Sequence, residues 1–102
     1  MLIILRRSLF DCDYESLVKL ARKMVEKRVN VAILHIQDAS MAVTLDTYLR
    51  EFLPSGIKIY VLREDCEVRG LLHKVKDGVR TVDYRGWVDL VMNRHDKVVF
   101  WT

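Results

Sequence analysis

The stretch Val31-Ala-Ile-Leu-His-Ile36-Gln37-Asp38 decides the fold. The residues from Val31 to Ile36 are almost wholly apolar and rich in β-branched or leucine side chains. Such a run is typical of a strand that is buried on both faces of a parallel sheet. Gln37 and Asp38 follow where a helix is expected to begin. The stretch therefore predicts one strand-to-helix step of an α/β domain.

The same step repeats on both sides of this stretch. Met1–Leu5 and Ile57–Leu62 have the same buried-strand pattern, and shorter strands are expected at residues 79–82 and 98–101. Because helices alternate with these strands, the connections should be right-handed crossovers. We therefore predict a single α/β domain over residues 1–102, a three-layer α/β/α sandwich with a mainly parallel five-stranded sheet.

Apolar residues at helical spacing mark the helices between the strands. Asp11 and Asp13 are candidate N-caps of the first helix, and Asp83 is one for the last. Gly70 can close the short third helix in a left-handed conformation. The apolar residues that mark the helices are Leu17, Leu20, Ala21, Met24 and Val25 on the first helix, Met41, Leu45, Tyr48, Leu49 and Phe52 on one face of the second, and Tyr84, Trp87, Val88 and Val91 on the last.

The composition fits one ordinary globular domain. The chain has 102 residues, of which 51% are hydrophobic and 30% are charged, and its net charge of +3 is not gathered into blocks. The longest apolar run, Met1–Leu5, is far shorter than the roughly 20 residues needed to span a bilayer. We also expect no basic-then-apolar leader before the domain. We therefore expect a cytoplasmic protein without membrane contact.

The first predicted helix carries a basic strip. Lys19, Arg22, Lys23 and Lys27 recur at a spacing that places them on its outer face. Two interpretations are open: a solvated helix face, or a surface that contacts RNA phosphates or an acidic partner.

In an open parallel sheet, ligand sites lie beyond the carboxyl ends of the strands. The candidate turns are residues 6–13, 37–40 and 63–66. None of them holds a glycine-rich phosphate cradle, and the whole chain has only 4 glycines. The 3 histidines and 2 cysteines also lack the spacing of metal ligands. We therefore expect no cofactor and no metal site.

Each cysteine is a candidate catalytic thiol. Cys12 lies between two aspartates, and Cys66 lies between an aspartate and a glutamate near the start of a predicted helix. A helix N-terminus favours the thiolate, whereas neighbouring carboxylates oppose it. Catalytic and structural roles therefore both stay open for Cys66 and Cys12.

Other chemistry-bearing side chains have simpler structural interpretations. His35 lies in a predicted buried strand, which favours a hydrogen-bonded core histidine over a ligand or a base. Capping of the following helix is a simpler role for Asp38 than orienting a substrate. Trp87 and Trp101 are expected to be core or interface anchors, because no basic and aromatic residues alternate around them.

Short motifs recur in a fixed order almost from end to end. They are Ser8-Leu9-Phe10, Gln37-Asp38-Ala39, Asp65, Arg69-Gly70, the dense tail Val82–Leu90, His95 and Trp101. In order and spacing they resemble the TusB/DsrH family of sulfur-relay subunits. The chain departs from the usual family pattern at Leu9, Ala39 and Trp87, where proline, glycine and phenylalanine are typical.

The resemblance implies a non-catalytic, accessory subunit of a sulfur-relay complex that passes sulfur as a cysteine persulfide. The sulfur ends in 2-thiouridine at the tRNA wobble position in one branch of the family and serves dissimilatory sulfur oxidation in another; we favour the tRNA branch. The implied partners are DsrE-like and DsrF-like (TusD-like and TusC-like) subunits in a hetero-oligomer. The resemblance also implies that tRNA is met only indirectly, and self-association is an open possibility when the partners are missing.

The resemblance also bears on the cysteines. The resemblance implies that the main acceptor cysteine of such complexes belongs to a paralogous subunit, and Cys66 lies on the same strand-to-helix turn as that cysteine but a few residues later. The first-helix cysteine of some DsrH-type members aligns with Leu17 or Val18, and Cys12 matches no family cysteine. Two alternatives therefore stay open: a stand-alone persulfide carrier that uses Cys66 or Cys12, and a small RNA-associated domain that uses the basic first helix.

Overall fold

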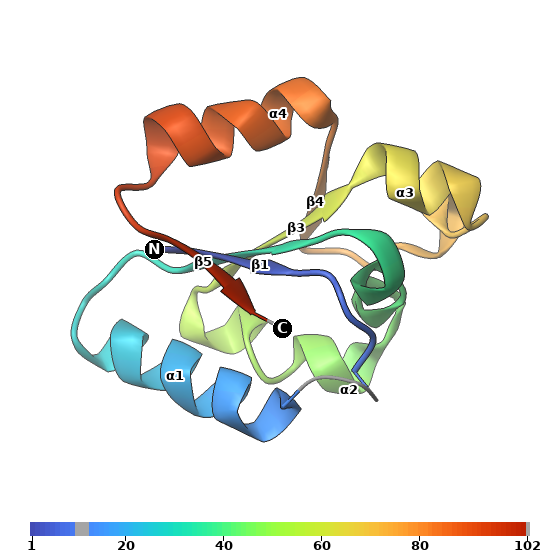
Figure 1. Cartoon of the computed structure of the whole chain (residues 1–102). Coiled ribbons are helices and arrows are strands. Elements are labelled where there is room, and N and C mark those ends of the chain that lie inside the picture. The colour runs from blue at the N-terminus through green and yellow to red at the C-terminus, as the bar shows by residue number, and fades with distance from the viewer. Residues whose placement is uncertain (10–12, 102) are drawn as a thin grey trace.

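The computed structural model describes residues 1–9 and 13–101. Strands alternate with helical segments along the whole chain (Figure 1). The elements are β1 (Leu2–Leu5), α1 (Tyr14–Glu26), β2 (Ala32–His35), the 3₁₀ helix η1 (Gln37–Thr44), α2 (Asp46–Leu49), the 3₁₀ turn η2 (Leu53–Ser55), β3 (Lys58–Leu62), α3 (Arg63–Val68), the 3₁₀ turn η3 (Leu72–Lys74), β4 (Val79–Val82), α4 (Tyr84–Asp89), the π-helical turn η4 (Leu90–Arg94) and β5 (Val98–Trp101).

The strands form one five-stranded sheet in the order β4-β3-β2-β1-β5. Every neighbouring pair is parallel, and Leu5 lies opposite both His35 and Trp101 in the register. Helices α1 and α2 lie below the sheet in Figure 1, whereas α4 lies above it. The predicted three-layer α/β/α fold is therefore confirmed, with a sheet that is parallel throughout.

The two faces of the sheet carry two separate apolar clusters, because successive strand side chains point to opposite faces. Ile3 and Leu5 of β1 belong to the first cluster, which packs against α1 and α2 and includes Tyr48 and Phe52. Leu2 and Ile4 belong to the smaller second cluster, which packs against α4 and η4. We call these sides of the sheet the closed face and the α4 face.

The local signals for helix ends are also confirmed. Asp13 Oδ1 accepts a hydrogen bond of 3.1 Å from the Ser16 N–H at the start of α1. Asp83 Oδ1 accepts one of 2.8 Å from the Gly86 N–H at the start of α4. Gly70 follows α3 with a φ of 66°, the left-handed conformation that glycine adopts without steric cost. Asp11, the other candidate cap, lies outside the described residues.

The predicted continuous helix face from Met41 to Phe52 is wrong. Residues 37–44 form a 3₁₀ helix, Leu45 is extended, and α2 is a single turn, so Met41 and Leu45 are 56% and 42% exposed. The Thr44 hydroxyl donates a hydrogen bond of 2.7 Å to the Met41 carbonyl. Such local side-chain bonds compete with the α-helical ladder, and this one lies at the break.

Candidate functional site

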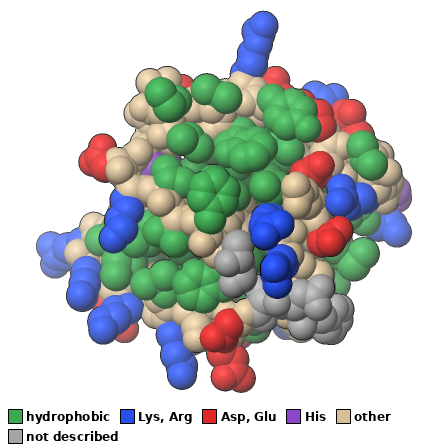
Figure 2. Space-filling view, in the orientation of Figure 1, with side chains coloured by type: hydrophobic (Ala, Val, Ile, Leu, Met, Phe, Trp, Pro, Cys, Tyr) green, Lys and Arg blue, Asp and Glu red, His purple; other side chains and the backbone are tan. Residues whose placement is uncertain are grey.

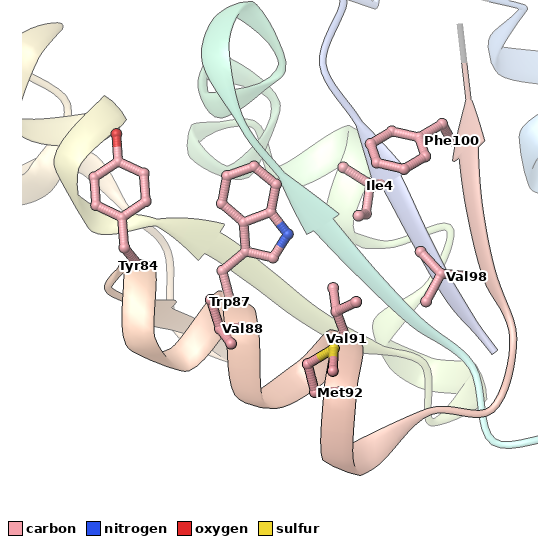
Figure 3. A pocket seen from close by; sticks show the side chains of 8 residues that line it. All are labelled: Ile4, Tyr84, Trp87, Val88, Val91, Met92, Val98 and Phe100. Carbon is pink, nitrogen blue, oxygen red and sulfur yellow. The ribbon is translucent and has the colours of Figure 1, made fainter.

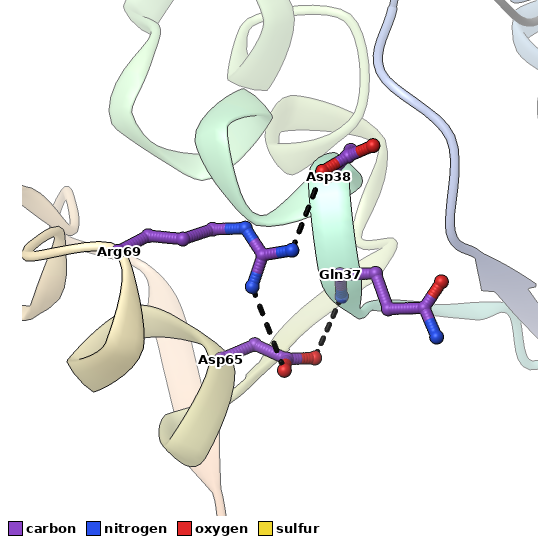
Figure 4. Close-up of polar contacts among 4 residues, drawn as sticks. All are labelled: Gln37, Asp38, Asp65 and Arg69. Atoms are coloured by element: carbon purple, nitrogen blue, oxygen red, sulfur yellow. Dashed lines mark hydrogen bonds and ion pairs between the residues drawn. The ribbon is translucent and has the colours of Figure 1, made fainter.

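Two turns meet at the carboxyl edge of the sheet, where a site is expected. β2 pairs with β3, so the turn into η1 lies beside the turn into α3. The Asp65 carboxylate crosses from α3 and accepts a hydrogen bond of 2.6 Å from the backbone N–H of Gln37 (Figure 4). Gln37 has a φ of 51°, in the left-handed region that a residue other than glycine seldom adopts. The Asp65 bond therefore holds a strained turn in place.

Arg69 completes this network. Its Nη2 lies 3.3 Å from Asp38 Oδ1, and its Nη1 lies 3.7 Å from Asp65 Oδ1. Two carboxylates thus share one guanidinium, as Figure 4 shows. We call Gln37, Asp38, Asp65 and Arg69 the edge network. All four residues lie within the motifs that the sequence analysis singled out, and the fold brings them together from two turns.

The predicted cap by Asp38 is corrected by this geometry. η1 begins after Ile36 without a side-chain cap, and the Asp38 carboxylate pairs with Arg69 instead. The acceptor at this turn is Asp65, which is 28 residues away in the chain. Local sequence offered no sign of such a bond. Only the pairing of β2 with β3, which brings the two turns side by side, could have indicated the bond between Asp65 and Gln37.

Cys66 lies next to the edge network but faces inward. Its side chain is fully buried in the first apolar cluster. Burial and the neighbouring Asp65 carboxylate raise the pKa of the Cys66 thiol, and the Arg69 guanidinium opposes them. Sulfur transfer requires an accessible thiolate. This environment keeps the thiol protonated and away from solvent. Cys12, the other candidate, lies outside the described residues.

His35 is a hydrogen-bonded core residue, as predicted. It is fully buried on the closed face, with Nδ1 2.9 Å from the Tyr60 carbonyl and Nε2 2.6 Å from the Tyr48 hydroxyl. Since a carbonyl only accepts, Nδ1 carries the proton and Nε2 accepts from Tyr48. Burial lowers the pKa of His35 to about 4. His35 therefore stays neutral near pH 7 and links β2, α2 and β3.

The remaining candidates lie apart from this edge. Lys19, Lys23 and Lys27 of the basic strip are exposed, whereas Arg22 pairs with Glu51 at 2.6 Å. Trp101 packs against the first cluster and Trp87 against the second, which confirms their role as apolar anchors.

Across residues 1–9 and 13–101, no three acidic, histidine or cysteine side chains gather as ligands for a metal ion. None of the described helices has the length and apolar character needed to span a bilayer.

Known proteins share this fold and this sequence pattern. The chain is similar to the ychN protein from E. coli, with a TM-score of 0.71 and 16% identity over 98% of this chain and 97% of that one. It is also similar to a conserved protein of unknown function from Bacteroides thetaiotaomicron, with a TM-score of 0.77 and 20% identity over 97% of this chain and 92% of that one. These likenesses show its fold class, a small parallel α/β domain.

Sequence comparison narrows the class to a family. The family model described as DsrH like protein matches residues 7–98. Protein TusB of Photorhabdus laumondii is 34% identical over 98 residues, which cover 95% of this chain and 97% of that protein. Protein TusB of Yersinia pestis is 28% identical over 102 residues, or 99% of this chain and 100% of that protein. The chain therefore belongs to the TusB/DsrH family of sulfur-relay subunits.

Proposed function

We propose that this chain is a non-catalytic, accessory subunit of a cytoplasmic persulfide-transfer complex that serves 2-thiouridine synthesis at the tRNA wobble position. Its partners in this proposal are DsrE-like and DsrF-like subunits, one of which carries the acceptor cysteine. In this proposal the chain does not bind tRNA directly, and its link to tRNA runs through the complex. Membership of the TusB/DsrH family supports the relay, and the burial of Cys66 is the observation that supports the accessory role.

The argument for an accessory role rests on the turn after β3. Cys66 lies in α3, a few residues after the position that the resemblance gives to the cysteine of the carrier subunits, and it is fully buried in the first apolar cluster. A persulfide on its sulfur would need space in a packed core, where an added atom typically costs about 1–3 kcal/mol. The raised pKa of the thiol also disfavours the thiolate that would attack a donor persulfide. The edge network further fixes this turn.

Sulfur loading of the assembled complex tests the proposal. The chain is co-expressed with its DsrE-like and DsrF-like partners and incubated with a cysteine desulfurase and ³⁵S-cysteine. We expect the label on the partner's cysteine and unchanged transfer with Cys66→Ala or Cys12→Ser. The Cys66→Ala variant keeps a small apolar side chain in the core, so we expect it to remain folded.

The same experiment separates the alternative function. A stand-alone persulfide carrier predicts label on Cys66 or Cys12 of the isolated chain and loss of transfer in the corresponding variant. Either result would contradict the accessory role. The exposed lysines of the basic strip do not by themselves favour RNA binding, since a solvated helix face looks the same.

A further inference from the structure

An open apolar groove lies on the α4 face of the sheet. It has a volume of about 440 Å³ and runs between α4 with η4 on one side and β1 with β5 on the other (Figure 3). Ile4 and Val98 form part of its sheet wall, and Trp87 lines its helix wall. Of the residues that the structure describes, none with a charged side chain lines it. The second apolar cluster is thus left partly uncovered.

The apolar character is confined to one flank of the last helical segment. On the other flank, toward β4, a separate hollow is lined by Arg80, Asp89 and Arg94, and the Asp89 and Arg94 side chains pair at 3.0 Å. On the groove side, Val88 and Met92 are 59% and 73% exposed. Asp89 and Arg94 therefore lie on the flank away from the groove. Segregation of this kind is expected where a second apolar surface covers a groove.

The groove continues onto the unpaired edge of the sheet. β5 is an outer strand, and its sequence Val98-Val-Phe-Trp101 contains no charged residue. Exposed edge strands are usually protected by charges, proline or bulges, because their free N–H and C=O groups pair with other chains. Phe100 is 62% exposed beside the groove. Figure 2 shows hydrophobic side chains gathered over this side of the molecule.

The size and lining of the groove favour a protein over a small molecule. Specific ligand sites combine apolar walls with convergent polar groups, but here the lining offers only the Tyr84 hydroxyl and the Trp87 indole N–H. Tyr84 and Phe100 are 54% and 62% exposed, and at about 150–250 Å² for each aromatic side chain they alone present roughly 230 Å². Val88 and Met92 extend this apolar area toward the about 800 Å² that each partner contributes to a standard interface.

We propose that the groove and the β5 edge, together the α4–β5 face, are the surface through which the chain binds a related α/β subunit. This inference rests on the proposed function. A subunit of the same fold has a helix and an outer strand in the equivalent positions, so the two chains can meet about a pseudo-two-fold axis with like surfaces in contact. An uncharged face suits such an arrangement, because no like charges are brought together.

Matched substitutions of exposed residues test the inference in the full chain. Val88→Asp and Met92→Lys place a charge in the groove, whereas Val68→Asp and Met41→Lys place the same charge on α3 and η1. Val68 and Met41 are 82% and 56% exposed, so neither control disturbs the core. Affinity for the co-expressed DsrE-like and DsrF-like subunits is measured by titration, and the mass of the complex by light scattering.

We expect Val88→Asp and Met92→Lys each to weaken assembly by about 30-fold or more, the effect typical of a buried interface anchor. The controls should change it by less than about 3-fold. Thermal unfolding checks that all four variants are folded. Wild-type affinity in both groove variants would overturn the inference and leave the proposed function standing. A wild-type chain that binds neither partner would overturn both, and a homodimer lost in the groove variants would assign the face to a second copy instead.

Discussion

Both faces of the sheet carry aromatic residues, but these residues differ in how far they are buried. On the closed face, Tyr48 and Phe52 are buried, and their rings lie 5.0 Å apart in an edge-on arrangement. On the α4 face, Tyr84 and Trp87 stack with their ring centres 6.3 Å apart, but Tyr84 is 54% exposed. Aromatic residues are thus part of the core on the closed face, whereas on the α4 face they remain partly exposed to solvent. The difference indicates that the closed face stabilises the fold, whereas the α4 face is suited to association.

A matched pair of phenylalanines gives the largest expected contrast. Phe52→Ala deletes a fully buried ring from the closed face and should lower the free energy of unfolding by about 3–5 kcal/mol. Phe100→Ala removes a ring that is 62% exposed and should cost less than about 1 kcal/mol. Urea denaturation of the isolated chain measures both. Similar losses in the two variants would contradict the division between the faces.

The second-largest effect is expected from acid, which should lower the free energy of unfolding through His35 on the closed face. The pKa of His35 is about 4 in the folded chain against an ordinary value of 6.5, so the unfolded chain binds the proton more readily. Above about pH 6.5 His35 is neutral in both the folded and the unfolded chain, so it does not reduce stability. As the pH falls from 6.5 toward 4, only the unfolded chain takes up the proton, and the free energy of unfolding decreases. From pH 7 to pH 4 the loss is about 3 kcal/mol.

The variant His35→Gln isolates this contribution, because glutamine can donate and accept but does not titrate. We expect it to be less stable than the wild type at pH 7 but to depend less on pH between 7 and 4. Denaturation curves across this range give the difference. Parallel pH profiles for the two proteins would show that His35 is not the buried titrating group.

Substitutions in the edge network should lower the free energy of unfolding by a smaller amount. The two carboxylates of the network should contribute unequally. Asp65→Asn weakens the bond to the Gln37 N–H and removes a charge beside Arg69, so we expect a loss of about 1–2 kcal/mol. Asp38 is mostly exposed, and its pair with Arg69 should be worth less than about 0.5 kcal/mol. Chemical denaturation of Asp65→Asn and Asp38→Asn compares them. Equal losses would mean that the cross-turn cap is not the dominant contact.

The smallest change in stability is expected for Val88→Asp on the α4 face. Val88 is 59% exposed, so the isolated chain should lose no more than about 0.5 kcal/mol of unfolding free energy. Thermal unfolding checks this value. A loss above 2 kcal/mol would mean that Val88 supports the monomer core, and any effect on assembly would then follow from unfolding.

Much of the fold could be predicted because periodicity and capping are local signals. The buried strands, the Asp13 and Asp83 caps and the left-handed Gly70 each depend on a few neighbouring residues. The break between η1 and α2 was missed because Met41, Leu45 and Tyr48 have perfect helical spacing. The competing bond from the Thr44 hydroxyl became visible only in three dimensions.

The site was less predictable, because its contacts join distant segments. The sequence marked Gln37, Asp38, Asp65 and Arg69 as motif residues, but the bond between Asp65 and Gln37 depends on the pairing of β2 with β3. Likewise, the sequence marked Val88 only as one of the apolar residues of the last helix. In the structure it is 59% exposed in the open groove between α4 and β5, which no pattern along the chain encodes.

The central claim is that the α4–β5 face is covered by a partner while the closed face serves the monomer. Hydrogen–deuterium exchange, compared between the free chain and its complex with the DsrE-like and DsrF-like subunits, tests this claim most directly. We predict slower exchange on assembly at residues 84–101, including the edge of β5, and little change at residues 14–26 and 46–49. Slower exchange in α1 and α2, with none in α4 and β5, would contradict the account.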